Sequence, residues 1–207
     1  MYVPASFAET DLNVLHQFIE QHSFATLITH QEYEPFASHL PLLLDRNIGT
    51  QGQLLGHFAK ANPQSKTTQH EQVLTIFHGP HAYISPTWYE AANTVPTWNY
   101  QAVHVYGRYS AIDDPDELKA VIEQTVTFYE ASAATPWSMQ NADPEFIDQL
   151  LQGIVGFKIE IERIEGKFKL SQNHPGERRE KVIHALKEQR HDDSQAIAAL
   201  MQSQLPT

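Results

Sequence analysis

Residues 12–19 carry the hydrophobic pattern of a helix near the start of the chain. Their apolar side chains recur at helical spacing, and Thr10 or Asp11 can cap the first turn. The pattern predicts an amphipathic helix that covers a sheet.

Between residues 23 and 112 the pattern is that of short strands. Runs rich in β-branched and aromatic residues are separated by Gly, Pro, Asn and Asp. These runs are residues 23–30, 36–44, 52–59, 72–79, 81–85 and 102–112. The links between the early runs are short and contain no helical period, which argues against parallel βαβ units. The pattern predicts a mainly β fold with flanking helices, built on an antiparallel sheet or barrel.

Helical patterns return after this region. Asp113 or Asp114 precedes Pro115 at the start of one helix, and Asp143 begins a second helix that Gly153 ends. Acidic residues follow each proposed cap, where the helix dipole favours negative charge. Both segments are therefore predicted as helices.

The next stretch alternates hydrophobic and charged residues, as a half-buried strand does, up to a turn expected near Glu165 and Gly166. Beyond that turn, Lys167 and Lys169 alternate along the chain and Ser171 adds a hydroxyl group. These residues either complete a site for an anion or form an exposed edge strand that the lysines protect from pairing.

The tail, residues 174–207, has the pattern of two helices. Pro175 opens the first, Ser194 can cap the second, and residues 191–193 are the expected flexible joint. Neither helix has enough apolar surface to be stable alone, so both should pack on the barrel or on a partner subunit. We therefore predict a barrel domain over residues 1–173 and a helical tail after it.

The composition limits where the chain works and what chemistry it can use. Hydrophobic residues make up 41% of the 207 residues and charged residues 19%, which fits one globular domain or two small ones. No apolar run can cross a bilayer and no secretory signal is visible, so we expect a cytoplasmic protein without membrane contact. Cysteine is absent, which excludes disulfides, thiolate catalysis and cysteine-ligated zinc.

The formal net charge of −11 should repel polyanions such as DNA. Residues 158–190 differ, because they hold nine basic residues against six glutamates. This segment is the only plausible surface for DNA, but its excess of positive charge is small and no helix-turn-helix is visible. DNA binding is therefore possible but weakly supported.

Common catalytic and nucleotide-binding motifs are missing. The chain has no glycine-rich Rossmann or P-loop pattern, no nucleophile elbow and no HExxH motif. His78 and His81 flank a Gly-Pro pair, which predicts a tight turn at a sheet end more readily than a metal site. No metal ligand and no catalytic residue is assigned.

The segment from residue 81 to 108 is the most unusual of the chain, with two tryptophans and four tyrosines. So much aromatic surface must be covered by a core, a dimer interface or a flat ligand. If a planar heterocycle binds here, Thr97, Asn99 and Tyr100 can hydrogen-bond its edge while Trp98 covers it.

Residues 56–66 form another candidate constellation, because a predicted strand ends there in His57 and a turn follows. Lys60, Asn62, Ser65 and Lys66 place cationic and neutral donors in a short span, which can hold a phosphate. A solvated turn explains the same residues equally well.

Taken together, these segments resemble the PaiB family of FMN-binding split-barrel proteins, which are negative transcriptional regulators. The resemblance covers nearly everything up to Asn173, and its distinctive strings are VPTWNY at residues 95–100 and GKFKLSQN at residues 166–173. It implies a split antiparallel β-barrel related to pyridoxamine-phosphate oxidases and flavin reductases. It also implies a homodimer with FMN at the subunit interface.

The resemblance further implies which positions contact the flavin. They come from the second predicted strand, the turn after the third, the aromatic segment and the last strand, and some of them are expected to act across the dimer. These positions are His39, Pro41, His57, Lys60, Asn62, Thr97, Trp98, Asn99, Tyr100, Lys167, Lys169 and Ser171.

The sequence thus predicts a cytoplasmic bacterial flavoprotein that acts as a PaiB-type transcriptional regulator. An alternative is an FMN-dependent oxidoreductase, resembling a flavin reductase or a pyridoxamine-phosphate oxidase, in which His39, His57 or Tyr100 donates protons. A haem-binding protein is a third reading, less favoured than the other two.

Overall fold

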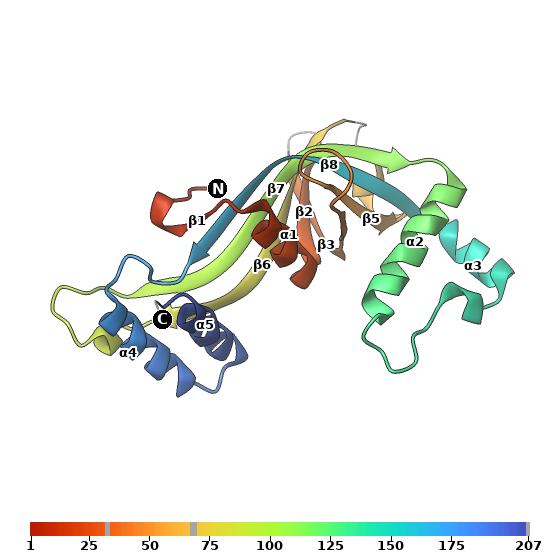
Figure 1. The fold of residues 1–207 in the computed structure, drawn as a ribbon. Coiled ribbons are helices and arrows are strands. Elements are labelled where there is room, and N and C mark those ends of the chain that lie inside the picture. Colours follow the sequence, from red (N-terminus) through yellow and green to blue (C-terminus); the bar gives the residue numbers. More distant parts are fainter. Residues whose placement is uncertain (32–33, 67–69, 206–207) are drawn as a thin grey trace. The chain divides into compact units, whose positions relative to one another are not determined.

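A computed structural model describes residues 1–31, 34–66 and 70–205 of the chain. It contains two compact units, each built from several segments (Figure 1). Unit 1 comprises residues 1–18, 77–104 and 165–207, and unit 2 comprises residues 19–76 and 105–164.

The described residues form eight strands and five α-helices, joined in places by short 3-10 turns. In chain order these elements are β1 (Ala8–Glu9), α1 (Leu12–Gln21), β2 (Phe24–Gln31), β3 (Glu34–Pro41), β4 (Leu43–Asp45), β5 (Gln53–Ala59), β6 (Gln72–Ile84), β7 (Thr97–Ile112), α2 (Pro115–Glu130), α3 (Pro144–Leu151), β8 (Ile154–Lys169), α4 (Gly176–Lys187) and α5 (Asp192–Ser203). No helix among these residues is long and apolar enough to cross a bilayer.

The strands make one sheet, hydrogen-bonded in the order β3-β2-β6-β7-β8-β5-β4, with β1 added to β8. The recorded pairings are antiparallel, including β2 with β3 and β5 with β8. Each of the three long strands β6, β7 and β8 contributes residues to both units. The prediction of a mainly β, antiparallel fold is confirmed.

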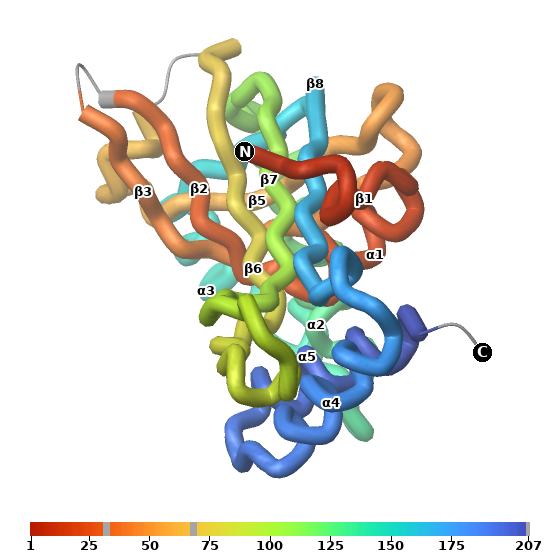
Figure 2. The backbone as a smooth tube through the Cα atoms, turned by 90° about the vertical axis from the view of Figure 1, so that its left-hand side faces the viewer, coloured from red at the N-terminus to blue at the C-terminus, as the bar shows by residue number. Residues whose placement is uncertain are grey.

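Unit 2 holds the β2–β3 hairpin, with β6 beside β2 (Figure 2). Helix α2 starts as predicted, because the Asp114 carboxylate accepts a hydrogen bond from the backbone N–H of Asp116 at 3.0 Å. Its buried Leu118 and Val121 pack with Leu43, Leu55 and Ile112 in one core cluster. Asp143 caps α3 in the same way.

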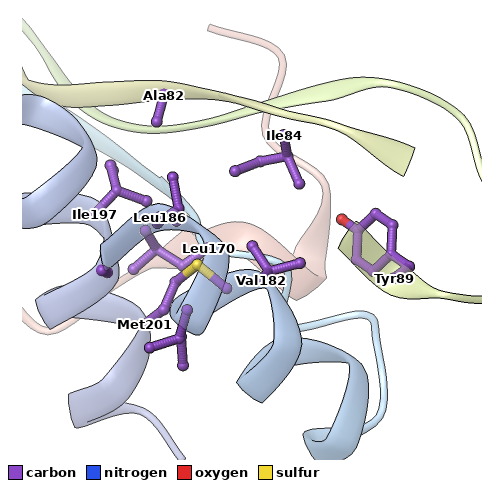
Figure 3. Close-up of a cluster of buried hydrophobic side chains, with 10 residues drawn as sticks. Ala82, Ile84, Tyr89, Leu170, Val182, Leu186, Ile197 and Met201 are labelled. Carbon is purple, nitrogen blue, oxygen red and sulfur yellow. The ribbon is translucent and has the colours of Figure 1, made fainter. Parts of the chain in front are cut away.

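Unit 1 contains the helical pair α4 and α5, and Figure 3 shows the apolar cluster that holds it. Val182 and Leu186 of α4 and Ile197 and Met201 of α5 are buried there. They pack with Ala82, Ile84, Tyr89 and Leu170 from the strands and loops of the same unit. Residues on both sides of position 173 therefore belong to unit 1, and the division into domains at that position stays a prediction.

Two turns predicted at glycines are wrong, because both glycines lie inside strands. Strand β6 runs through the Gly79-Pro80 pair, and β8 runs through Gly166. A Cβ atom on Gly79 would lie 2.9 Å from the Phe18 ring, and one on Gly166 would collide with the Leu15 side chain. Each glycine is thus needed for close packing of α1 rather than for a turn.

Two further boundaries differ from the sequence prediction. Helix α5 begins at Asp192 after the N-cap His191, so Ser194 lies within the helix and residues 191–193 are not a loose joint. The two aspartates stand at the N-terminal end of the helix, where its dipole favours negative charge. Strand β7 begins at Thr97, so the VPTWNY string is largely strand and not loop.

Candidate functional site

The start of β7 divides the predicted flavin contacts between two faces. Successive side chains of a strand point to opposite faces, so Trp98 and Tyr100 lie on one face of unit 1 and Thr97 and Asn99 on the other. Burial agrees with this alternation, since Trp98 is 52% exposed and Asn99 is 0% exposed. The four neighbouring candidates therefore cannot all meet one ligand on one face.

The exposed face is aromatic. The Trp98 ring lies 5.9 Å from the rings of Tyr83 and His81, and the Tyr83 ring meets it edge-on. Tyr83 is 47% exposed, and Tyr2 is more exposed still. These rings leave flat, apolar surface in contact with water.

A lysine adds positive charge to this surface. The Lys167 amine lies 5.3 Å from the centre of the Tyr100 ring and 5.6 Å from that of Tyr2, in cation–π geometry. It also donates a hydrogen bond to the Tyr2 carbonyl oxygen at 3.1 Å. We call Tyr2, Tyr83, Trp98, Tyr100 and Lys167 the aromatic face.

The opposite face of β7 is polar and buried. The Asn99 side-chain amide donates to the Ser171 hydroxyl at 3.0 Å and contacts the Met201 sulfur at 3.3 Å. The Tyr89 hydroxyl lies 3.4 Å from the same Ser171 oxygen, and the Tyr89 ring stacks on His174 at 4.6 Å. Asn99 thus holds Ser171 in place, and its amide is already used within the protein.

Ser171 has an unusual backbone conformation. Its φ of 62° lies in the left-handed region, which a residue with a side chain seldom adopts. The residue lies two positions after the end of β8, and only 2% of it is exposed. Such strain persists where the surrounding structure imposes it, and it often marks a functional site.

A pocket of about 240 Å³ opens beside Ser171 within unit 1. We call it the Ser171 pocket. Its lining consists of Tyr89, Asn93, Thr94, Val95, Thr97, Asn99, Lys169, Ser171, Asn173, His174 and Arg178. Four of the predicted contact residues therefore meet here, namely Thr97, Asn99, Lys169 and Ser171.

Two titratable groups of this pocket have a lowered pKa. Burial lowers the pKa of the Lys169 amine, and repulsion from Lys167 lowers it further. Lys169 hydrogen-bonds the Thr97 hydroxyl and donates to the Trp98 carbonyl oxygen at 2.7 Å. Burial also lowers the pKa of His174, with smaller contributions from Arg178 and Lys169.

The other predicted contacts belong to unit 2 and are less concentrated. His39 is exposed, and its Nδ1 lies 3.0 Å from the Thr26 hydroxyl. Pro41 ends β3, partly buried. His57 on β5 is half-buried, and burial lowers its pKa. Lys60 follows β5 with an exposed side chain.

The turn at residues 60–66 uses several of its donors internally. The Asn62 amide donates to the Ser38 hydroxyl at 2.8 Å, and its oxygen accepts from the Gln64 backbone N–H at 2.9 Å. The Ser65 hydroxyl donates to the Lys60 carbonyl oxygen at 3.2 Å. These contacts favour the structural reading of this turn over a phosphate site.

Sequence reasoning missed several residues around the two candidate surfaces. Arg178 and His174 lie in the tail, whose pattern indicated only packing helices. Tyr89 belongs to the aromatic segment but carried no distinguishing signal. Gln64 is fully buried and donates to the Thr29 hydroxyl at 3.0 Å. No sequence motif indicated this contact.

Comparison with known proteins identifies a family. Residues 1–163 match the family described as "Putative FMN-binding domain". The chain is 39% identical over 206 residues to "Protease synthase and sporulation protein PAI 2" of Bacillus subtilis (strain 168), covering 99% of this chain and 98% of that protein. It is 33% identical over 233 residues to an uncharacterized protein of Aspergillus fumigatus, with 88% and 89% covered.

Solved structures with low identity share the fold. The flavocytochrome Anf3 from Azotobacter vinelandii superimposes with a TM-score of 0.59 at 12% identity, over 79% of this chain and 69% of that one. The FAD and heme binding protein from Mycobacterium smegmatis gives a TM-score of 0.56 at 10% identity, over 78% and 73% of the two chains. The predicted split-barrel fold is confirmed.

Proposed function

The chain belongs to the PaiB family of FMN-binding split-barrel proteins, and from this premise we propose that FMN lies against the aromatic face, at the interface of a homodimer that regulates transcription. FMN is the cofactor of this family. We propose three further points: the position of the flavin, the homodimer and the regulatory role. The name of the Bacillus relative supports a role connected with protease synthesis and sporulation.

The exposed aromatic surface is the observation that carries the proposal. The isoalloxazine ring is flat and largely apolar, and the Trp98 and Tyr83 rings offer it a matching surface. Lys167 beside these rings supplies a positive charge for the anionic phosphate group. When bound, FMN supplies hydride or electron transfer, while the protein orients it and excludes water.

A second copy of the chain would complete this surface. Tyr2 is 84% exposed and Val95 is 72% exposed in unit 1, which leaves apolar surface around the flavin uncovered. A partner subunit that packs there would bury both the residues and the ring. The cytoplasmic location and the bacterial source belong to the same proposal and rest on the sequence alone.

Flavin retention by the purified protein tests the proposed site. We expect the absorbance spectrum, after addition of FMN and desalting, to show about one flavin per chain. Trp98→Ala should weaken FMN binding about fivefold or more, because it removes a stacking surface worth roughly 1 kcal/mol or more. Trp137→Ala is the matched control, since Trp137 is similarly exposed but lies in unit 2.

Equal FMN affinity in Trp98→Ala and the unaltered protein would remove the aromatic face from the site. A Soret band in place of the flavin bands would favour the haem-binding reading. Steady oxidation of NADH or NADPH by the holoprotein would favour the oxidoreductase alternative over regulation.

A further inference from the structure

The Ser171 pocket concentrates positive charge on an otherwise acidic chain. Lys169 comes from the end of β8, His174 from the following turn and Arg178 from the first turn of α4. No Asp or Glu is among the described lining residues. This is unusual in a chain of net charge −11.

Lys169 and Arg178 have no acidic partner among the residues that the structure describes. Neither Lys169 nor Arg178 takes part in any ion pair recorded among residues 1–31, 34–66 and 70–205. By contrast, Lys181, one turn further along α4, pairs with Glu90 at 2.9 Å and with Glu177 at 3.5 Å. Partly buried cations without a carboxylate favour the binding of an anion from outside the chain.

The neutral groups of the pocket are held rigidly. Asn99 is completely buried and bonded to Ser171, whose strained backbone places its hydroxyl between Asn99 and Tyr89. The wall beside the cations is therefore fixed by hydrogen bonds within the protein, as in a built site and unlike a solvated surface. Burial is the main cause of the lowered pKa of Lys169 and of His174, and a bound anion would oppose it by favouring the charged form of both groups.

The size of the pocket limits its ligand. Its volume of about 240 Å³ is below the roughly 300–1,000 Å³ typical of sites for drug-sized molecules. A whole flavin with its ribityl phosphate chain would not fit. Tyr89 and Val95 add apolar wall, which suits a short carbon skeleton rather than a bare inorganic ion.

We propose that the Ser171 pocket binds a small organic anion, whose carboxylate or phosphate group is held by Lys169 and Arg178. The site goes beyond the proposed function, because none of the aromatic-face residues Tyr2, Tyr83, Trp98, Tyr100 and Lys167 lines it. Two of its lining residues, His174 and Arg178, lie beyond Asn173, where the resemblance to the FMN-binding family ends.

The pocket is also connected to the proposed flavin face. Lys169 donates a hydrogen bond to the carbonyl oxygen of Trp98, and Asn99 is the next residue along β7. An anion that draws the Lys169 amine toward itself acts directly on the backbone beneath the Trp98 ring.

Calorimetric titration of the full-length protein tests the proposal. The probes are succinate, inorganic phosphate and the neutral analogue succinamide. We expect an anion to bind at one site per chain, and Arg178→Gln to weaken it about tenfold, as the loss of a charge-assisted hydrogen bond does. Lys181→Gln removes the same charge from the same helix outside the pocket and should leave the affinity within about twofold.

The two anions distinguish a carboxylate ligand from a phosphate ligand, and tight binding of either supports the site. The proposal is overturned if neither anion binds at millimolar concentration, if Arg178→Gln binds as tightly as the unaltered protein, or if succinamide binds as well as succinate. Circular dichroism checks that Arg178→Gln is folded. FMN retention is measured separately on the same samples. If the protein does not retain FMN, the measured anion affinity can still be interpreted.

Discussion

Trp98 and Asn99 are consecutive in the chain yet serve opposite faces of β7. Trp98 is half exposed beside Tyr83, whereas the Asn99 amide is buried against Ser171 and Met201. Substitution of each should therefore have a different consequence. Loss of Trp98 removes a surface for the flavin, while loss of Asn99 removes the shorter of the two side-chain hydrogen bonds that hold the strained Ser171.

His104, further along the same strand, is expected to make stability depend on pH. Burial lowers its pKa to about 4, with smaller contributions from the Met1 ammonium group and from His78. Its Nδ1 has no hydrogen-bond partner among the residues that the structure describes. The folded state therefore favours the neutral ring over the protonated one.

The sign of the effect follows from this lowered pKa. Above about pH 6.5 the His104 ring is neutral in the folded and in the unfolded chain. Between about pH 6.5 and pH 4 the unfolded chain binds a proton at this ring, whereas the folded chain does not. Stability is thus lost as the pH falls from about 6.5 toward 4. Because the ring is partly exposed, we expect a loss of only about 1 kcal/mol between pH 7 and pH 5.

Urea unfolding at pH 7 and pH 5 measures this loss. His104→Gln carries no titrating group and should lose about 1 kcal/mol less than the unaltered protein over the same interval. An equal loss in both proteins would mean that other groups cause the pH dependence.

At the scale of the elements, glycines decide how closely strands and helices approach. A Cβ atom on Gly107 of β7 would collide with the backbone oxygen of Glu160 and with the Ile159 side chain, all within unit 2. A backbone oxygen cannot rotate away as a flexible side chain can. The strand must shift if this position carries any side chain.

Gly107→Ala should therefore lower the free energy of unfolding by about 1–3 kcal/mol, the usual cost of overpacking. The control is Gly176→Ala at the start of α4, where an added Cβ meets nothing within 4 Å. That variant should stay within about 0.5 kcal/mol of the unaltered protein. Urea unfolding of both variants decides the matter, and equal stability of the two would refute the close approach at Gly107.

Local sequence signals predicted the positions of many elements and failed where packing overrides them. The aspartate caps of α2 and α3 were predicted because a cap involves only neighbouring residues, and the start of α4 was predicted from Pro175 and Gly176. The turns expected at Gly79 and Gly166 were wrong. Each of these glycines lies in a strand and packs closely against α1, which is distant in sequence. The onset of β7 at Thr97 was missed, since proline and polar residues before it indicated a loop.

At the scale of the whole molecule, the proposed homodimer has a measurable consequence. Light scattering after size exclusion should give twice the chain mass of 23.5 kDa for the protein with FMN. Trp98→Glu should shift the mass toward a single chain, because it buries an unpaired charge in the interface.

The matched variant for this measurement is Trp137→Glu, which adds the same charge at an exposed tryptophan of unit 2. We expect it to stay dimeric. A single-chain mass for the unaltered protein would contradict the dimer, and a dimeric Trp98→Glu protein would place the interface elsewhere.

The sequence by itself determined the β-rich fold class, the capped starts of α2 and α3 and the family to which the protein belongs. These depend on alternation, capping residues and the strings VPTWNY and GKFKLSQN, all of which are local. Only the tertiary structure decided that Trp98 and Asn99 serve different surfaces and that Lys169, His174 and Arg178 line one pocket. The reason is physical: which face a residue occupies, and which distant residues meet it, depend on strand pairing and helix packing across long separations in the chain.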